Sequence, residues 1–356
     1  MPAALVADPV LDVGREAFTG GRDYLAACTL GLPPTAAVEG MRVHLDAWAA
    51  GRPDPVAYTA AVERSRGLYA GLVGVDPARV AIGSQTSVYA ALVAASLPDG
   101  AEVLCAEGDF SSLVVPFVRA GRGITVRTAP LTDLAASVRA DTALVAFSLV
   151  QSATGDVADA DAIARAAASV GAPTFCDVTQ AVGWMPVDAA MFDMTVCHTY
   201  KWLCAPRGVA FFTASPGVVA STRPIFAGWY AGDDPWTSCY GGDVELAPDA
   251  RRFDVSPAWQ AFLGAEPALA LFASLDAGAV FAHTTSLAER FRRGRGMDAA
   301  ARPSAIVTWT DPTGCDLARL AAAGITASGR AGRARVAFHV FNDAADVDRA
   351  LRALGV

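Results

Sequence analysis

Short apolar runs alternate with helical patterns between about residues 55 and 215 of the chain. Several of these runs are continuous stretches of Val, Ile, Leu and Phe, which is typical of strands covered on both faces. The runs lie at 80–82, 103–105, 124–127, 144–148, 174–176, 194–197 and 209–212, and the intervening spacing predicts helices over 88–96, 131–139 and 159–170. This alternation predicts an α/β fold on a mainly parallel seven-stranded sheet, with a ligand site beyond the carboxyl ends of the strands.

The pattern changes after about residue 215. Pro, Gly, Trp and Tyr gather in 215–257, which predicts an irregular segment that lines a site. A long helical pattern follows over 265–293. Shorter patterns at 305–310, 335–339 and 343–354 indicate a smaller α+β domain near the C-terminus.

Composition and charge exclude several classes of function. The 356 residues carry 36 acidic and 28 basic side chains, and the net charge of −8 disfavours binding to nucleic acid or to an anionic membrane. The seven cysteines form no CxxC pair, which disfavours zinc fingers and disulfide scaffolds, and we expect no metal site. The N-terminal residues lack a signal-peptide pattern, and no apolar run approaches the roughly 18 residues of a membrane span. We therefore expect a soluble cytoplasmic protein.

One of the 28 basic side chains is a lysine, Lys201, and the other 27 are arginines. A Walker A loop and the protein-kinase signature each need a lysine in a different context, so both are excluded. Lys201 follows a predicted buried strand and lies between Tyr200 and Trp202. A surface lysine is the simpler interpretation. Partial burial beside an apolar strand, however, would lower the pKa of the amine and free it to attack a carbonyl carbon.

Two further segments carry candidate chemistry. Asp177 ends a predicted apolar strand and is followed by Gln180; a buried carboxylate there needs a cationic partner, although a helix N-cap is the alternative. The segment 83–87, Gly-Ser-Gln-Thr-Ser, follows a strand and opens a helix. That pattern suits a phosphate group, but it also describes an ordinary N-cap. A phosphate site, an acid for a protonated pyridine nitrogen and an amine for an aldehyde are together the three attachments of pyridoxal phosphate.

Along the chain the phosphate segment comes first, then the acid and then the lysine. In this order the segments resemble the class V aminotransferase group of fold-type I pyridoxal-phosphate enzymes, which includes cysteine desulfurases, selenocysteine lyases, kynureninases and isopenicillin N epimerase-like proteins. The likeness runs from Tyr24 to the C-terminus. It implies that Lys201 binds the cofactor as a Schiff base, that Asp177 keeps the ring nitrogen protonated and that Gln180 contacts the ring oxygen. It further implies phosphate contacts from Ser84, Gln85, Thr86, His198 and Tyr200, and a ring contact from Phe110, for which core packing is the alternative.

The resemblance also implies where the substrate binds. The segment 328–342 is similar to the C-terminal motif of the family, and Arg335 takes the place of the residue that binds the substrate carboxylate, a task suited to a guanidinium. Arg330 and His339 lie in the same motif, and their roles stay open. The side chains expected to touch the substrate or the ring oxygen after the strand at 144–148 are Gln151 and Ser152.

The domain organisation implied by the resemblance has three parts. Residues 1–30 associate with the small domain, residues 31–255 form the large cofactor-binding domain, and residues 256–356 form the small C-terminal domain. The family builds its sites at a dimer interface, so we expect a homodimer. The usual Gly-Thr that reaches the phosphate of the neighbouring subunit is missing, and Ser256 is the candidate substitute.

A second departure bears on the reaction. Cysteine desulfurases carry a nucleophilic cysteine shortly before the carboxylate-binding arginine, whereas 324–335 contains none and the nearest is Cys315. Together with the likeness to the lyase branch of this group, the missing cysteine leads us to expect a lyase that eliminates the sulfur substituent of an S-substituted cysteine. An aminotransferase is the alternative, followed by a decarboxylating or epimerising variant. A non-catalytic α/β binding protein with a coincidental lysine is the alternative from a different class.

Overall fold

The computed structural model describes residues 9–356 and confirms the predicted α/β fold. The large sheet has the strand order β1-β7-β6-β5-β4-β2-β3. Its strands are β1 (Val80–Gly83), β2 (Glu102–Ala106), β3 (Thr125–Ala129), β4 (Thr142–Ser148), β5 (Thr174–Asp177), β6 (Met194–His198) and β7 (Ala210–Ala214). The five neighbouring strands β3, β2, β4, β5 and β6 run parallel to one another, whereas β7 pairs antiparallel with both β6 and β1.

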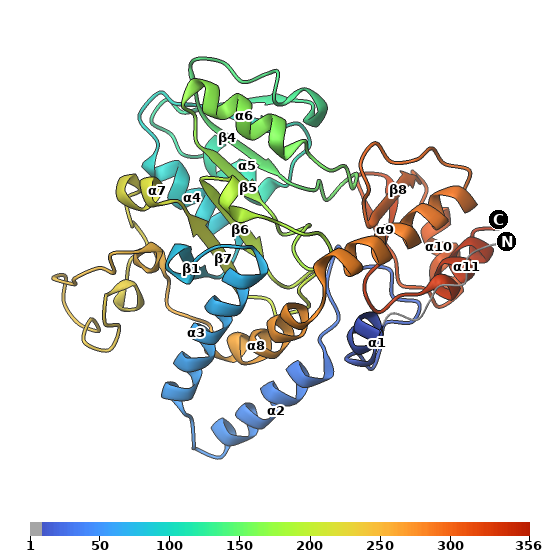
Figure 1. Cartoon of the computed structure of the whole chain (residues 1–356), viewed down its shortest axis with the longest axis horizontal. Helices are drawn as coiled ribbons and strands as arrows, with labels where there is room; N and C mark the ends of the chain where they lie inside the picture. Colours follow the sequence, from blue (N-terminus) through green and yellow to red (C-terminus); the bar gives the residue numbers. More distant parts are fainter. Residues whose placement is uncertain (1–8) are drawn as a thin grey trace.

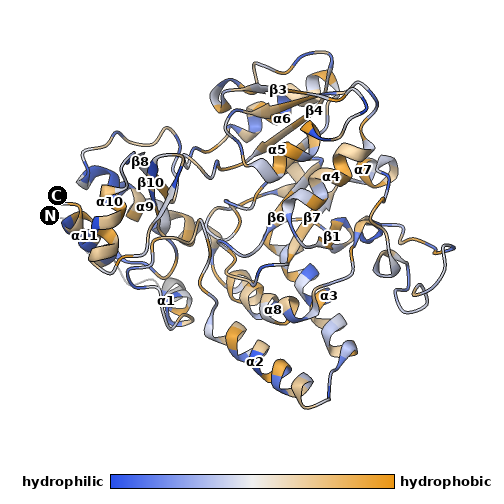
Figure 2. Cartoon of the chain, turned by 180° about the vertical axis from the view of Figure 1, so that it is seen from behind, coloured by the Kyte–Doolittle hydropathy of each residue, from blue (hydrophilic) through white to orange (hydrophobic). Residues whose placement is uncertain are grey.

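Helices lie on both faces of this sheet, so its central strands are buried on both sides (Figure 1). Successive residues of one strand point into two different cores: Phe211 packs in the core on one face and Phe212 in the core on the other. This is why the strands read as continuous apolar runs, which Figure 2 shows as hydrophobic strands. The helices of this part of the chain are α2 (Thr35–Ala49), α3 (Pro55–Leu72), α4 (Thr86–Ser96), α5 (Ser111–Val118), α6 (Ala160–Val170), α7 (Pro216–Ser221) and α8 (Trp259–Ser274).

The C-terminal part forms a second, three-stranded antiparallel sheet in the order β8-β10-β9. Its elements are α9 (Ala277–Gly294), β8 (Ile306–Thr310), α10 (Cys315–Ala322), β9 (Ser328–Arg330), β10 (Arg333–Ala337) and α11 (Ala344–Ala353). The chain after α1 (Pro9–Glu16) runs along this sheet, where Leu25 N donates to Thr326 O at 2.8 Å and Ala337 N donates to Leu25 O at 2.9 Å. Residues 1–8 of the expected segment 1–30 lie outside the described residues.

Two of the predicted helices are wrong in extent. The stretch 131–139 holds a short 3-10 turn, Leu131–Asp133, followed by irregular turns. Leu134 is buried in the core, and Leu131, Ala135 and Val138 pack against it, so the apolar spacing marks the core-facing side chains without a regular helix. The long helix expected over 265–293 is two helices, α8 and α9, which meet at 90°. Asp276 begins the second helix by accepting a hydrogen bond from Ala279 N at 2.6 Å.

The bend between α8 and α9 lets one stretch of chain serve two parts of the molecule. Helix α8 packs on α2 and α3 beside the large sheet, whereas α9 packs on β8 and α11 (Figure 1). Within residues 9–356, no single helix is both long and apolar enough to cross a membrane; α8 and α9 reach that length and composition only when taken together.

Candidate active site

The side chains singled out in the sequence gather at the carboxyl edge of the large sheet. Asp177 is the last residue of β5, and His198 is the last residue of the neighbouring strand β6. Lys201 follows three residues later. Parallel strands end at the same edge of a sheet, so the topology brings the acid and the amine together. The charge of Asp177 accordingly acts on the pKa of Lys201.

Lys201 is buried, with 5% of its surface exposed. Its Nζ lies 5.2 Å from the ring centroid of Phe110 and 5.6 Å from that of Tyr200. Burial lowers the pKa of the amine to about 8, and the negative charge of Asp177 partly offsets this effect. Phe110 itself is 40% exposed, so its position is not one of plain core packing. A buried amine with a lowered pKa beside an open aromatic ring is suited to attack a carbonyl carbon.

Asp177 is equally buried, and burial raises the pKa of its carboxyl group. Hydrogen bonds from Thr179 oppose this increase, and Thr179 N donates to Asp177 Oδ1 at 2.8 Å. The charge of Lys201 and a hydrogen bond from Thr86 act in the same direction, so the turn before α4 lies beside this carboxylate. A buried carboxylate in such surroundings suits a cationic N–H group of a ligand.

The turn between β1 and α4 leaves the start of a helix uncapped. Gln85 stands at the N-cap of α4 with extended backbone, and its side chain makes no capping hydrogen bond. A side chain is excluded just before the turn, because a Cβ on Gly83 would lie 2.6 Å from the ring of Tyr89. The N–H groups of the first helical turn therefore have no side-chain cap, which suits them to a phosphate group.

His198 adds a second polar group to this end of the site. Its ring packs edge-on against Tyr200, with the ring centroids 4.4 Å apart. Burial lowers the pKa of the imidazole to about 3, so the ring is neutral at physiological pH. Its Nε2 is buried and has no hydrogen-bond partner within residues 9–356. A buried polar atom in a native structure normally has a partner, so this nitrogen points to a ligand group.

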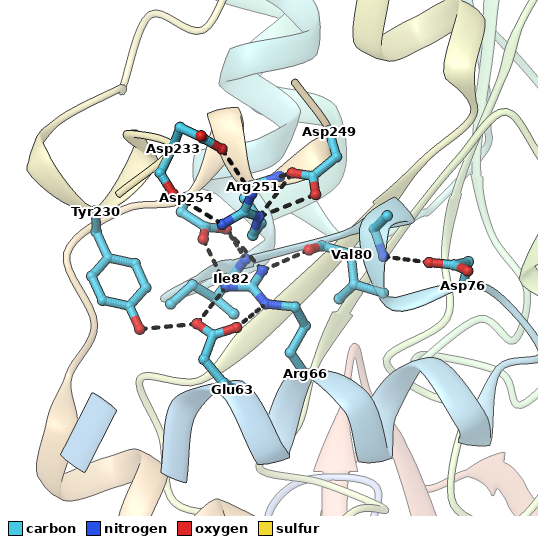
Figure 3. A network of polar contacts seen from close by, with 11 residues as sticks. Glu63, Arg66, Asp76, Val80, Ile82, Tyr230, Asp233, Asp249, Arg251 and Asp254 are labelled. Atoms are coloured by element: carbon cyan, nitrogen blue, oxygen red, sulfur yellow. Dashed lines mark hydrogen bonds and ion pairs between the residues drawn. The ribbon is translucent and has the colours of Figure 1, made fainter. Parts of the chain in front are cut away.

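A buried ionic network holds β1 in place directly before the turn (Figure 3). Arg66 on α3 binds Asp254 with Nη2 2.8 Å from Oδ2, and the two side chains are 3% and 1% exposed. Asp254 Oδ1 accepts from Ile82 N at 2.7 Å, and Arg66 Nη1 donates to Val80 O at 2.6 Å. Glu63 binds the other side of Arg66. Because β1 is an edge strand, these side chains supply partners to main-chain groups on its unpaired edge.

Gln180 is held from both ends of its side-chain amide. Its Nε2 donates to the main-chain oxygen of Cys28 at 2.9 Å, and its Oε1 accepts from the indole Nε1 of Trp202 at 2.7 Å. The main-chain oxygen of Gln180 accepts from the indole of Trp184 at 2.6 Å. Gln180, for which the resemblance implies a contact with the cofactor ring, is thus fixed in a single orientation.

Arg335 is 1% exposed and has neutral partners only within residues 9–356. Its Nε donates to Ser328 Oγ at 3.1 Å, its Nη2 donates to Thr29 Oγ1 at 2.7 Å, and its Nη1 donates to the carbonyl oxygen of Ser152. Its charge lowers the pKa of Lys201, which places the guanidinium near the amine. A buried guanidinium without a carboxylate partner favours binding of an anionic ligand.

The other three residues expected at the site, Gln151, Ser152 and Ser256, make hydrogen bonds to protein groups. The amide of Gln151 donates to Glu107 O at 2.9 Å, and Ser152 meets Arg335 through its carbonyl oxygen instead of its hydroxyl. Ser256 Oγ accepts from the indole of Trp229 at 3.2 Å. Gln151 and Ser152 thus border the site as protein-bound groups, while Ser256 is engaged with the irregular segment after β7.

Sequence reasoning missed several residues that build the site. Thr29 and Ser328 orient Arg335, Cys28 presents its carbonyl to Gln180, and Trp202 binds the amide of Gln180. Their contacts join segments up to 306 residues apart, which no local pattern reveals. The available signals were the segment Tyr24–Gly31, where the resemblance begins, and the position of Trp202 directly after Lys201.

Comparison with known proteins gives a consistent result. A model of the family described as aminotransferase class-V matches residues 56–294. Isopenicillin N epimerase of Streptomyces clavuligerus is 30% identical over 214 residues, which cover 54% of this chain and 52% of the relative. Kynureninase of Deinococcus radiodurans is 30% identical over 232 residues, which cover 62% and 56%. The matches therefore span little more than half the length of these relatives.

Solved structures are similar over nearly the whole chain. The cysteine desulfurase CsdA of Escherichia coli has a TM-score of 0.83 at 19% identity and covers 98% of both chains. The complex of the cystine C-S lyase C-DES with cysteine persulfide has a TM-score of 0.84 at 20% identity and covers 94% of this chain and 97% of that one. At these identities the likeness shows a shared fold.

Proposed function

The chain belongs to the aminotransferase class-V family of fold-type I pyridoxal-phosphate enzymes, and from this premise we propose that it is a lyase that eliminates a thiol from an S-substituted cysteine. The proposal rests on the combination of a buried amine, a buried acid and a buried arginine, Lys201, Asp177 and Arg335. It is further supported by the lack of a cysteine in 324–335 to take up sulfur. The structural likeness to a cystine C-S lyase agrees with this reaction class.

The residues around Lys201 fit pyridoxal phosphate, the cofactor of the family. The cofactor has an aldehyde, a ring nitrogen and a phosphate, and the site offers the amine of Lys201, the carboxylate of Asp177 and the uncapped start of α4. The unpartnered Nε2 of His198 provides a further group for the phosphate end. We propose that Ser84, Gln85, Thr86 and Tyr200 complete that end, that Phe110 covers the ring and that Gln180 binds its oxygen.

The proposed mechanism assigns one task to each charged side chain. Arg335 binds the substrate α-carboxylate and fixes Cα beside the amine. Once the substrate amine has displaced Lys201 from the cofactor, the freed amine of Lys201, with its lowered pKa, would take the proton from Cα. Asp177 would hold a proton on the ring nitrogen, and the cofactor, when bound there, would supply the sink for the electron pair left on Cα. The C–S bond then breaks with its electrons on sulfur, and the sulfur leaves as thiol with the proton that Lys201 took from Cα. Water converts the remaining three-carbon fragment to pyruvate and ammonia.

We also propose that the functional unit is a homodimer, as the resemblance implies. Helix α2 exposes the large apolar side chains of Val38, Val43, Leu45 and Trp48, and two of them, Val38 and Leu45, line a hollow of about 570 Å³. The hollow is also lined by Cys204–Arg207, shortly after Lys201. An exposed apolar surface of this kind is typical of a protein interface, so a second copy on α2 would lie next to the Lys201 loop.

The proposed activity is tested with a panel of S-substituted cysteines. Incubation of the holoenzyme with each compound is expected to release thiol, pyruvate and ammonia in equal amounts, because one elimination yields one molecule of each. The matched control is alanine, which has the same Cα but no sulfur substituent to lose.

The alternative, an aminotransferase, gives a different result in the same assay. It would convert the amino acids to keto acids only when a keto-acid acceptor is present. Keto acid formation without release of thiol would contradict the lyase proposal.

A further inference from the structure

Trp202 and His339 contact the site but have no part in the mechanism described above. Trp202 follows Lys201, and His339 belongs to the C-terminal motif whose roles the sequence left open. We propose that Trp202, held by His339, is a positioning residue that fixes Gln180 as a hydrogen-bond donor toward the ring oxygen of the cofactor. This inference rests on the proposed contact between Gln180 and that oxygen, and it adds which atom of the amide makes the contact and why.

The orientation of the Gln180 amide follows from the chemistry of its two partners. An indole N–H can only donate, so the group 2.7 Å from Trp202 Nε1 must be the oxygen of the amide. A main-chain carbonyl can only accept, so the group 2.9 Å from Cys28 O must be the amide nitrogen. Reversing the amide would place two donors against each other and two acceptors against each other. One N–H of Gln180 remains after these bonds, and the residue can offer it to a ligand.

His339 fixes the position of Trp202. Its Nδ1 accepts from Val340 N at 2.7 Å, so its proton lies on Nε2, which donates to the main-chain oxygen of Trp202 at 2.8 Å. The two rings also stack, with centroids 5.3 Å apart and an interplanar angle of 25°. Asn342 Oδ1 accepts from His339 N at 2.9 Å and ties the histidine to the C-terminal segment. The indole therefore cannot turn away from Gln180 without breaking buried contacts.

The donor orientation has a measurable consequence for the bound cofactor. An N–H group directed at the ring oxygen stabilises negative charge on that oxygen. It therefore favours the form of the Lys201-bound cofactor that has lost its proton, and it lowers the pKa of that group. A hydrogen bond to a charged atom is worth about 1.5 kcal/mol, which corresponds to about one pH unit in that pKa.

The test compares two tryptophans that bind the same glutamine. Trp202→Phe removes the indole that holds the amide oxygen, whereas Trp184→Phe removes an indole that binds only the main-chain oxygen of Gln180. Both tryptophans are buried, and their ring centroids lie 5.6 Å apart. The visible absorption band of each holoenzyme is titrated with pH. We expect the midpoint to rise by about one pH unit in Trp202→Phe and to stay within about 0.2 units of wild type in Trp184→Phe.

Two results would overturn the inference: an unchanged midpoint in Trp202→Phe, or an equal rise in both variants, which would indicate general loosening of the site. If Trp202→Phe does not give folded holoenzyme, Gln180→Met decides the question, because it removes the donor and keeps a side chain of similar length. Its midpoint is expected to rise by the same amount, and an unchanged value would also overturn the inference. Cofactor binding and thiol release are measured on the wild-type protein and do not depend on the three variants. Failure of this inference is therefore distinguishable from failure of the proposed function.

Discussion

Replacement of Lys201 by alanine is expected to lower the turnover number for thiol release by at least about 10³-fold. The substitution removes both the amine that attaches the cofactor and the base that takes the Cα proton, and general-base catalysis alone contributes about 10²- to 10⁴-fold. No other lysine is present in the chain to take over either task. The measurement is the steady-state rate of thiol release, with the visible absorption spectrum recorded on the same samples.

Lys201→Arg is the matched control because it keeps the positive charge in the same place. A guanidinium stays protonated at any accessible pH, so it can neither attach the aldehyde nor accept a proton. We therefore expect the two variants to lose the same activity. If the arginine variant kept more than about a tenth of the turnover, Lys201 would act only as a charge, and the proposed base would be wrong.

Replacement of Asp254 by alanine is expected to lower the free energy of unfolding by about 3–5 kcal/mol, because it removes the buried partner of a buried ion pair and leaves Arg66 only a half-exposed one. In this variant Glu63 would be the remaining charged partner of Arg66, and Ile82 N would lose its hydrogen-bond acceptor (Figure 3). Because this network holds β1 before the turn at Ser84, we also expect weaker cofactor binding. The measurements are urea unfolding and a cofactor titration.

Two controls separate burial from charge in this experiment. Asp348→Ala breaks an exposed ion pair in which the side chain of Arg290 is 47% exposed and that of Asp348 is 38% exposed. This substitution is expected to change the free energy of unfolding by at most about 1 kcal/mol. Asp254→Asn keeps an oxygen for Ile82 N but loses the charge, so its effect should lie between those of the two alanine variants. If Asp254→Ala were no more destabilising than Asp348→Ala, the network would not hold β1.

The sheet was predictable because each central strand is buried on both faces. Such strands appear as continuous apolar runs, and all seven runs of the sequence lie on or overlap the strands of the large sheet. The helix expected over 131–139 was wrong because apolar spacing identifies side chains that face the core, here Leu134 and Val138, but does not fix the backbone conformation that presents them. The break between α8 and α9 was missed because the helical pattern continues across it, although Leu275 ends α8 and Asp276 caps the start of α9.

The site was predictable where topology does the positioning. Asp177 ends β5, and Lys201 follows the end of the neighbouring parallel strand β6, so the strand order brings the two side chains together. The contacts of Arg335 with Thr29 and Ser152 were not predictable, because they join three segments that meet only through tertiary packing. The same holds for the network of Arg66 and Asp254, whose partners are 188 residues apart.

The central claim, that Lys201 is the residue that carries pyridoxal phosphate, is tested most directly by borohydride reduction of the holoenzyme followed by peptide mapping. Reduction fixes the cofactor on the amine that holds it, and the chain offers two kinds of amine, Lys201 and the N-terminus. We predict that the cofactor is found on the peptide containing Lys201 and on no other peptide. Recovery of the cofactor on the N-terminal amine alone, or on no peptide at all, would contradict the claim.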